Sequence, residues 1–276
     1  MNIKQLKSDK QFIKLVKSIA DYWDGGLNLN LKFKIQKSLN EEKISSIKEA
    51  YELYNWPYHI KKQNLPDTIH QCGSSFKKSN EVLMYAKNIM LDSPSCFYKD
   101  KLTEGSLLIL EWGGVLNYNN KRINDYGPDK FLSFIQQADV KWQKIKKGGD
   151  FSISDSFDFH SNAGFTKIYS VLFDDFIIYD SRVAAALAFI AKKCLGDIPP
   201  EKWRFFIPPN KGDKDKRYIE GFSFSNEKKK HFYSNIIANL LILEVQSELK
   251  KRNKKVGLRH IEAALFMIGY DISNYK

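Results

Sequence analysis

The chain has 276 residues, of which 43% are hydrophobic, 14% aromatic and 28% charged. This composition is typical of a folded protein and excludes wholesale disorder, and no apolar run approaches the roughly 18 residues that a membrane span needs. The 44 Lys and Arg residues exceed the 32 Asp and Glu residues, giving a formal charge of +12, which favours a nucleic acid as partner.

Helical periodicity dominates the sequence, because apolar residues recur on one face along most of it. In chain order, the expected helices cover residues 11–19, 40–54, 81–90, 130–142, 165–173, 181–195, 231–250 and 258–268. Asn40 and Asp129 are expected to cap the second and fourth of them. Residues 58–78 and 199–226 lack a period and contain Pro and Gly, so we expect irregular segments there, the second of them a long loop.

Strand alternation is scarce in this sequence. Residues 176–180 and 222–225 are the only short candidates, and neither has an evident pairing partner. The sequence therefore predicts a mainly α fold with few short strands. We expect one compact helical unit over residues 1–276, in which residues 1–100 form an N-terminal helical part and residues 101–276 carry the functional motif.

A glycine-containing turn opens the helix expected at residue 165. Asn162-Ala163-Gly164 form this turn, and a turn at a helix N-terminus presents backbone N–H groups that suit a phosphate. Lys167 projects away from the apolar face of the helix, so the core does not need it. Asp180 ends the next apolar stretch, where the N-cap of the following helix belongs. Taken singly, Lys167 reads as a surface charge and Asp180 as a simple cap.

Together these residues resemble the helix-hairpin-helix and catalytic-aspartate core of DNA glycosylases, in particular bacterial proteins similar to 8-oxoguanine DNA glycosylases. In that family a Gly-x-Thr-Lys tetrad carries the nucleophilic lysine, and here it reads Gly164-Phe165-Thr166-Lys167. The family's catalytic aspartate begins a following helix, and Asp180 holds the matching position. The resemblance covers residues 159–190, and the final helix also fits it. The chain departs from the family in its hairpin, where His160-Ser161-Asn162-Ala163-Gly164 replaces Leu-Pro-Gly-x-Gly.

The resemblance implies a helix-hairpin-helix DNA glycosylase-like helical fold and a base-excising enzyme, with Lys167 and Asp180 as its catalytic residues. A neutral lysine amine attacks the sugar C1′ and forms a Schiff base, which also gives AP lyase activity, while a carboxylate stabilises the cationic sugar. The substrate would be double-stranded DNA carrying a damaged or modified base. The biological role would be repair, or defence against phages whose DNA is modified.

Residues around the motif are expected to bind the DNA and hold the base. The expected DNA contacts are Asn162, Gly164, Thr166 and Arg182. An enzyme that acts on a base must flip it out of the duplex and stack it in a pocket. The aromatic candidates for this pocket are Trp112, Phe222, Phe266 and Tyr270.

Other residues indicate no cofactor. The three cysteines, Cys72, Cys96 and Cys194, are far apart and predict reduced thiols rather than a disulfide framework or a metal site. The five histidines show no metal-ligand spacing, so we expect no catalytic metal. Lysines scattered through residues 1–12, in place of the apolar segment of a signal peptide, predict a cytoplasmic protein. We expect a monomer without a membrane partner.

Two other functions stay open at this point. A metal-dependent nuclease would use paired carboxylates such as Asp174-Asp175, but it also needs a Glu-x-Lys strand, and no convincing one follows. A helical protein that only binds DNA or another partner would use Lys167 as a contact and form no imine. A coding sequence poor in G and C would also enrich the chain in Lys, Asn and Ile, so charge alone does not decide the partner.

Overall fold

The structure is a computed structural model of the chain, and it is mainly helical, which confirms the predicted class. It describes residues 1–33, 42–61, 65–91, 98–152, 154–155, 159–197, 199–209, 215–222, 224–225 and 227–273. The α-helices are α1 (Ile3–Ser8), α2 (Lys10–Asp24), α3 (Ile47–Glu52), α4 (Phe76–Leu91), α5 (Tyr98–Trp112), α6 (Leu116–Lys146), α7 (Ala163–Leu172), α8 (Ser181–Leu195), α9 (Lys228–Lys251) and α10 (Leu258–Ile268). Two short 3-10 helices, η2 (Glu201–Trp203) and η3 (Asp215–Arg217), lie in the segment expected to be a long loop.

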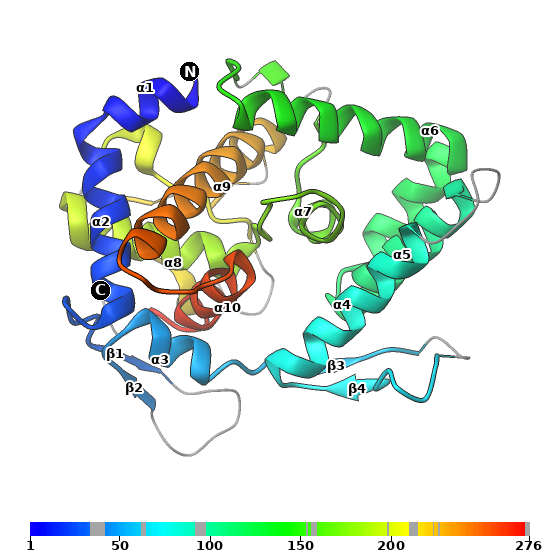
Figure 1. Ribbon diagram of the computed structural model, residues 1–276, viewed down its shortest axis with the longest axis horizontal. Coiled ribbons are helices and arrows are strands. Elements are labelled where there is room, and N and C mark those ends of the chain that lie inside the picture. Colours follow the sequence, from blue (N-terminus) through cyan, green and yellow to red (C-terminus); the bar gives the residue numbers. More distant parts are fainter. Residues whose placement is uncertain are drawn as a thin grey trace.

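The helices form two groups with α7 between them (Figure 1). In one group, α2 packs against α8 and α9, and α10 packs against α3 and α8. In the other group, α5 packs against both α4 and α6. Helix α7 contacts α4, α5 and α6, and it is seen end-on near the centre of the view. Segments from both ends of the chain therefore share the first group, and α7 connects it to the second.

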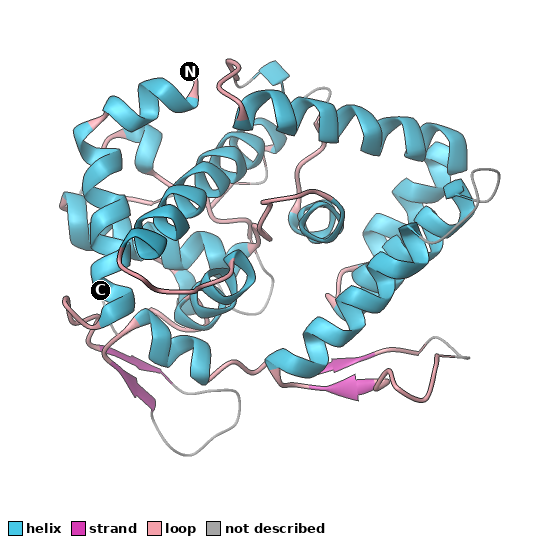
Figure 2. Cartoon of the chain, in the orientation of Figure 1, coloured by secondary structure: helices cyan, strands magenta, loops and turns pink. Residues whose placement is uncertain are grey.

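Four short strands make two small antiparallel sheets (Figure 2). Strand β1 (Leu31–Phe33) pairs with β2 (Glu42–Ile44), and β3 (Tyr58–His59) pairs with β4 (Cys72–Gly73). None of them coincides with a predicted strand. Residues 176–180 are extended, but among the described residues no strand pairs with them, and within 222–225 only Phe224 makes a single bridge, to Ile207. Neither stretch is therefore a strand among the described residues, in keeping with the lack of an evident pairing partner in the sequence.

Helix termini follow local capping chemistry, with two departures from the prediction. Asp180 accepts hydrogen bonds from the N–H groups of Arg182 and Val183, as expected for the N-cap of α8. Helix α3 is capped by Ser46 instead, while Asn40 lies outside the described residues. Asp129 caps no helix, because α6 runs through this region. The helix is kinked at Gly127, which has a φ of 68° and comes directly before Pro128.

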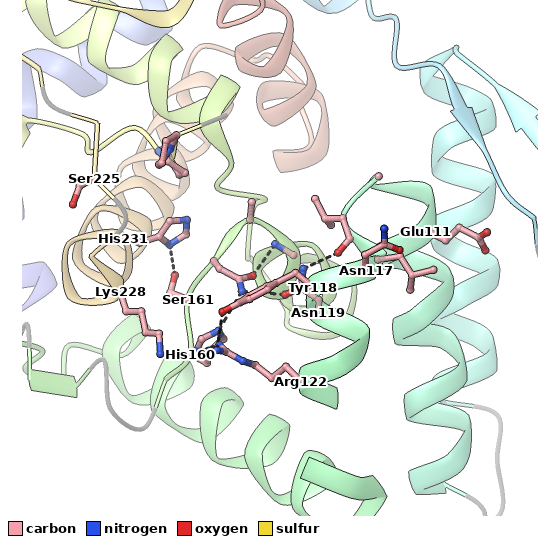
Figure 3. Close-up of a pocket in the computed structure, with 18 of the residues that line it drawn as sticks. Glu111, Asn117, Tyr118, Asn119, Arg122, His160, Ser161, Ser225, Lys228 and His231 are labelled. Carbon is pink, nitrogen blue, oxygen red and sulfur yellow. Dashed lines mark hydrogen bonds between the residues drawn. The ribbon is translucent and has the colours of Figure 1, made fainter. Parts of the chain in front are cut away.

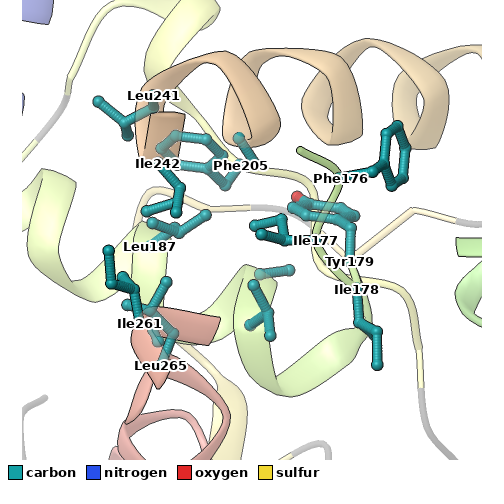
Figure 4. Close-up of a cluster of buried hydrophobic side chains, with 14 of the residues drawn as sticks. Phe176, Ile177, Ile178, Tyr179, Leu187, Phe205, Leu241, Ile242, Ile261 and Leu265 are labelled. Carbon is teal, nitrogen blue, oxygen red and sulfur yellow. The ribbon is translucent and has the colours of Figure 1, made fainter. Parts of the chain in front are cut away.

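The extended residues 176–180 pass through the hydrophobic core (Figure 4). The buried side chains drawn around them come from three helices and one loop: Leu187 of α8, Leu241 and Ile242 of α9, Ile261 and Leu265 of α10, and Phe205 of the loop after η2. Without a sheet, the backbone N–H groups here bond to side chains. Ile177 donates to Asn239 Oδ1 at 2.7 Å, Ile178 to Glu262 Oε2 at 3.0 Å, and Tyr179 to Thr166 Oγ1 at 3.2 Å. This segment is consequently fixed by α9, α10 and α7 at once.

The Thr166 hydroxyl is the part of this arrangement that is easiest to isolate. Its Oγ1 accepts from Tyr179 N–H and is within donating distance of Tyr179 O, at 3.1 Å. We expect Thr166→Val, which keeps the side chain's shape, to lower the free energy of unfolding by about 1–3 kcal/mol, because it leaves buried backbone groups unpaired. Urea denaturation measures this change.

A matched control for this substitution is Thr103→Val. Thr103 is half-buried and bonds only within its own helix, to Lys99 O, so the same change should cost no more than about 0.5 kcal/mol. Equal losses in the two variants would contradict the role assigned to Thr166.

Candidate functional site

The structure brings Lys167 and Asp180 together, as the motif order predicts. Lys167 Nζ lies 3.2 Å from Asp180 Oδ2 and 3.3 Å from the carbonyl oxygen of Ala163. Both side chains are buried, with Lys167 5% and Asp180 8% exposed. Lys167 comes from the second turn of α7 and Asp180 from the N-cap of α8, so two helix starts hold the pair.

The Asp180 carboxylate is held in its ionised form. Burial alone would raise the pKa of Asp180, but the ammonium of Lys167, the N–H of Val183 and the guanidinium groups of Arg182 and Arg217 outweigh it and lower the pKa. Asp180 therefore combines two tasks, since Oδ1 caps α8 while Oδ2 pairs with Lys167.

Gly113, at the end of α5, lies directly against Lys167. A Cβ atom at Gly113 would stand 2.5 Å from Lys167 Cδ and 2.8 Å from Cε, closer than real Cβ contacts allow. The missing side chain thus leaves the space in which the lysine stem extends. Nothing in the local sequence indicates this contact, because α5 and α7 meet only in the folded chain.

A cavity of about 260 Å³ opens beside Lys167 and Asp180. Its aromatic lining includes Tyr54, Trp56, Trp112 and Phe266, and its polar lining includes Lys167, Asp180, Arg182, Arg217, Arg259 and Glu262. Two of the residues predicted for the base pocket, Trp112 and Phe266, therefore line this cavity. Tyr54, Trp56, Arg259 and Glu262 were not predicted, since each is a single residue inside a segment with no motif.

Arg182 connects this cavity to the last of the predicted aromatics. Its guanidinium carbon lies 4.2 Å from the ring centroid of Phe266, 4.6 Å from that of Tyr270 and 5.2 Å from that of Trp56. Tyr270 thus contributes to the wall through Arg182 but does not line the cavity. Phe222 lies elsewhere, in a depression with Glu201 and Arg204, so its prediction as a base-pocket residue is wrong.

The turn before α7 is occupied by its own hydrogen bonds. Asn162 Oδ1 accepts from the N–H groups of Gly164 and Phe165, both at 2.8 Å, and Asn162 Nδ2 donates to Asn119 Oδ1. At Gly164 a Cβ would meet Asn119 Nδ2 at 2.3 Å, so the close approach of Asn119 requires this glycine. Thr166 is fully buried, so the prediction that it contacts DNA is wrong.

A larger groove, of about 790 Å³, lies next to the cavity (Figure 3). The two share Gly114, Val115, Ala163, Pro208 and Pro209 as lining residues, so the groove leads toward Lys167 and Asp180. Asn162 and Gly164 line it, as do the basic side chains of Lys61, Arg122 and Lys228 and the acidic Glu111. Positive charge outweighs negative charge among these residues, which suits a polyanion.

Two buried histidines, His160 and His231, also line the groove. Burial and the nearby charges of Arg122 and Lys228 lower the pKa of His160 to about 3. Burial lowers the pKa of His231 to about 4, although Asp180 raises it in part. Both rings are therefore neutral near pH 7.

The tautomer of His231 follows from a chain of hydrogen bonds. The Ile177 N–H can only donate, so Asn239 uses its oxygen there and donates from Nδ2 to Asn235 Oδ1 at 2.8 Å. Asn235 Nδ2 then donates to Ser161 Oγ at 3.1 Å, and the Ser161 hydroxyl donates to His231 Nδ1 at 2.7 Å. His231 consequently carries its proton on Nε2.

The lowered pKa of His231 makes the stability of the fold depend on pH. Between the unfolded pKa of 6.5 and the folded value of about 4 for His231, the unfolded chain binds more protons, so stability falls as the pH falls. We expect His231 to account for a loss of about 2 kcal/mol between about pH 7 and about pH 5.

Urea denaturation at these two pH values measures the loss, and His231→Gln, which removes the titrating ring, should reduce it. A wild-type protein equally stable at both values would contradict the neutral, buried state of the ring.

No family model, curated protein or solved structure matches the chain. Throughout the described ranges, no three side chains of His, Cys, Asp or Glu gather as metal ligands would. Asp174 and Asp175, the carboxylates considered for a nuclease, lie in the turn after α7, where Asp175 pairs with Lys146. No described helix is long and apolar enough to cross a bilayer.

Proposed function

We propose that the chain is a DNA glycosylase that acts on double-stranded DNA as a monomer, with Lys167 as its nucleophile. The observation that carries this proposal is the buried Lys167–Asp180 pair, 3.2 Å apart, between a cavity lined by aromatic rings and a basic groove. An isolated surface lysine would need none of this setting. A duplex lying in the groove would place one flipped nucleotide at the cavity.

The proposed reaction begins with the Lys167 amine in its neutral form, attacking C1′ of the flipped nucleotide. The C1′–N bond breaks, the electron pair leaves with the base, and the base takes up a proton. Asp180 accepts the Lys167 proton and supplies it to the departing base, and the carboxylate regenerated in this way stabilises positive charge on the sugar. The resulting adduct is an aminal, and opening of its sugar ring gives an imine: the C1′–O4′ bond breaks, and O4′ takes up the proton that the attacking nitrogen releases. Elimination of the 3′ phosphate from this imine constitutes the AP lyase step.

The charge of the chain supports DNA as the ligand. The chain has a net charge of +12, and part of its positive charge lines the groove, on Lys61, Arg122 and Lys228. The same chemistry would serve repair of damaged DNA and defence against phages with modified DNA, because the two roles differ only in the base that enters the cavity.

The covalent imine provides the test. Borohydride should trap the wild-type protein on a duplex that carries a substrate base or an abasic site, and Lys167→Gln should abolish the adduct because it removes the amine. The adduct is measured by its reduced mobility in a denaturing gel. EDTA should leave trapping unchanged, whereas a metal-dependent nuclease would lose its activity.

Lys146→Gln is the matched control, since Lys146 also pairs with an aspartate, Asp175, at 3.0 Å but lies outside the cavity and the groove. It should retain trapping. If Lys167→Gln released bases as fast as the wild type, the proposed function would be refuted, and duplex binding without any base release would leave a DNA-binding protein.

Gly113 offers a test that keeps both catalytic side chains. We expect Gly113→Ala to slow base release by about 100-fold, because the new methyl group displaces the Lys167 amine by an ångström or more. Single-turnover kinetics measure the rate, and duplex affinity should stay near that of the wild type.

Gly26→Ala is the control, because a Cβ there meets its nearest atom at 3.6 Å, an ordinary contact. Unchanged kinetics in Gly113→Ala would show that the Lys167 position does not govern the rate.

A further inference from the structure

Both carboxylates and one carbonyl oxygen of the cavity wall already accept hydrogen bonds from the protein itself. Asp180 accepts from two backbone N–H groups and from Lys167. Glu262 accepts from Ile178 N–H through one oxygen and pairs with Arg259 through the other. The carbonyl oxygen of Trp112 accepts from the indole N–H of Trp56 at 3.0 Å.

Donors, in contrast, are left over in the same wall. The indole Nε1 of Trp112 and both Nε and Nη2 of Arg259 are buried and have no acceptor among the described residues. Trp112 is only 3% exposed, so bulk water does not supply the hydrogen-bond acceptor that its indole N–H lacks. Burial raises the pKa of Tyr54, and the charge of Arg259 together with a hydrogen bond between the two side chains partly offsets this. Nε and Nη2 of Arg259 still have no partner of normal geometry among the described residues.

Trp112 and Arg259 are held in place beside each other. The guanidinium carbon of Arg259 lies 5.6 Å from the ring centroid of Trp112 and 5.9 Å from that of Phe76, and its pairing with Glu262 fixes the other end. Glu262 is itself tied to the Ile178 backbone. The unpaired N–H groups are therefore held in fixed positions. Both side chains line the cavity.

We propose that the cavity accepts a base whose inserted edge presents oxo groups, and that Trp112 and Arg259 select it against the corresponding amino-bearing base. This inference rests on the proposed function, since it names the class of base that the glycosylase takes. An oxo group supplies the acceptor that these donors lack. An amino group would set donor against donor, leaving both buried and unpaired, and a site of this kind rejects such a ligand strongly.

The test compares bases that differ in oxo and amino groups. The probes are duplexes with one hypoxanthine or adenine, and one uracil or cytosine, each as a 2′-fluoroarabino nucleotide that resists cleavage. Each base stands opposite an abasic spacer, so that no pairing has to be broken. Wild-type protein should bind the oxo member of each pair about 10- to 100-fold more tightly, as expected for one hydrogen-bonding group lost at a charged or buried site.

Two variants assign the preference to these side chains. Trp112→Phe keeps an aromatic ring but removes the N–H, and Arg259→Lys keeps the charge but removes Nε and Nη2. Each should reduce the oxo preference about tenfold or more while binding of the amino duplex stays the same. Trp142→Phe is the control, because the Trp142 indole donates to Asp174 O outside the cavity; its preference should be that of the wild type. Melting temperatures confirm that each variant is folded.

The outcomes separate the inference from the function. Equal affinity for oxo and amino duplexes would overturn the inference even if the enzyme excised bases. A wild-type preference that survives both substitutions would also overturn it, because other groups would then be responsible. A preference that both variants lose supports the inference, and if no base were ever released, only the proposed chemistry would fail.

Discussion

Three consecutive backbone N–H groups, those of Ile177, Ile178 and Tyr179, determine where the candidate site lies. They are buried and have no strand partner among the described residues, so a side chain must accept each one. The acceptors come from α9, α10 and α7. Because Asp180 is the next residue in the chain, these three bonds also fix its carboxylate beside α7. There its Oδ2 lies 3.2 Å from Lys167 Nζ.

Glu262 shows how the structural and functional parts share one group. Its carboxyl is fully buried, and burial raises its pKa although Arg259 and the Ile178 N–H counteract this. One oxygen supports the backbone before Asp180 and the other orients Arg259 in the cavity wall. A change at Glu262 would therefore alter the position of the Asp180 carboxylate and the polarity of the cavity together, and its effect could not be assigned to either alone.

Sequence reasoning located the parts of the site that depend on local order. The bounds of α8 and α10 and the meeting of Lys167 with Asp180 follow from caps, periodicity and the motif, all of which act over a few residues. Residues such as Asn239, Glu262 and Trp56 could not be found in this way. A polar residue within a helical pattern has no local feature that tells a core acceptor from a surface group, and the partner lies 62 residues away for Asn239 and 84 for Glu262.

The same limit explains why residues 176–180 were a candidate strand. Residues 176–180 have the apolar composition of a strand, but side chains from three helices take the place of a neighbouring strand. Helices α2 and α3, which lie within residues 1–100, pack with α8, α9 and α10 from the other part of the chain. The hairpin is where the sequence departs from the glycosylase motif, and here the hydrogen bonds of Asn162 and Asn119 fill the turn.

The resting pair sets a specific requirement for chemistry. Asp180 is ionised and accepts three hydrogen bonds, two of which hold α8, so its carboxylate cannot move toward a substrate without loosening that helix. The mobile partner is therefore the lysine, whose long stem lies along Gly113 with only Ala163 O and Asp180 as acceptors. A base that fills the cavity would exclude water from Lys167 and Asp180 and so raise the free energy of keeping both side chains charged there. In the proposed reaction, transfer of the lysine proton to Asp180 would remove both charges at once and leave the amine neutral when the substrate is in place.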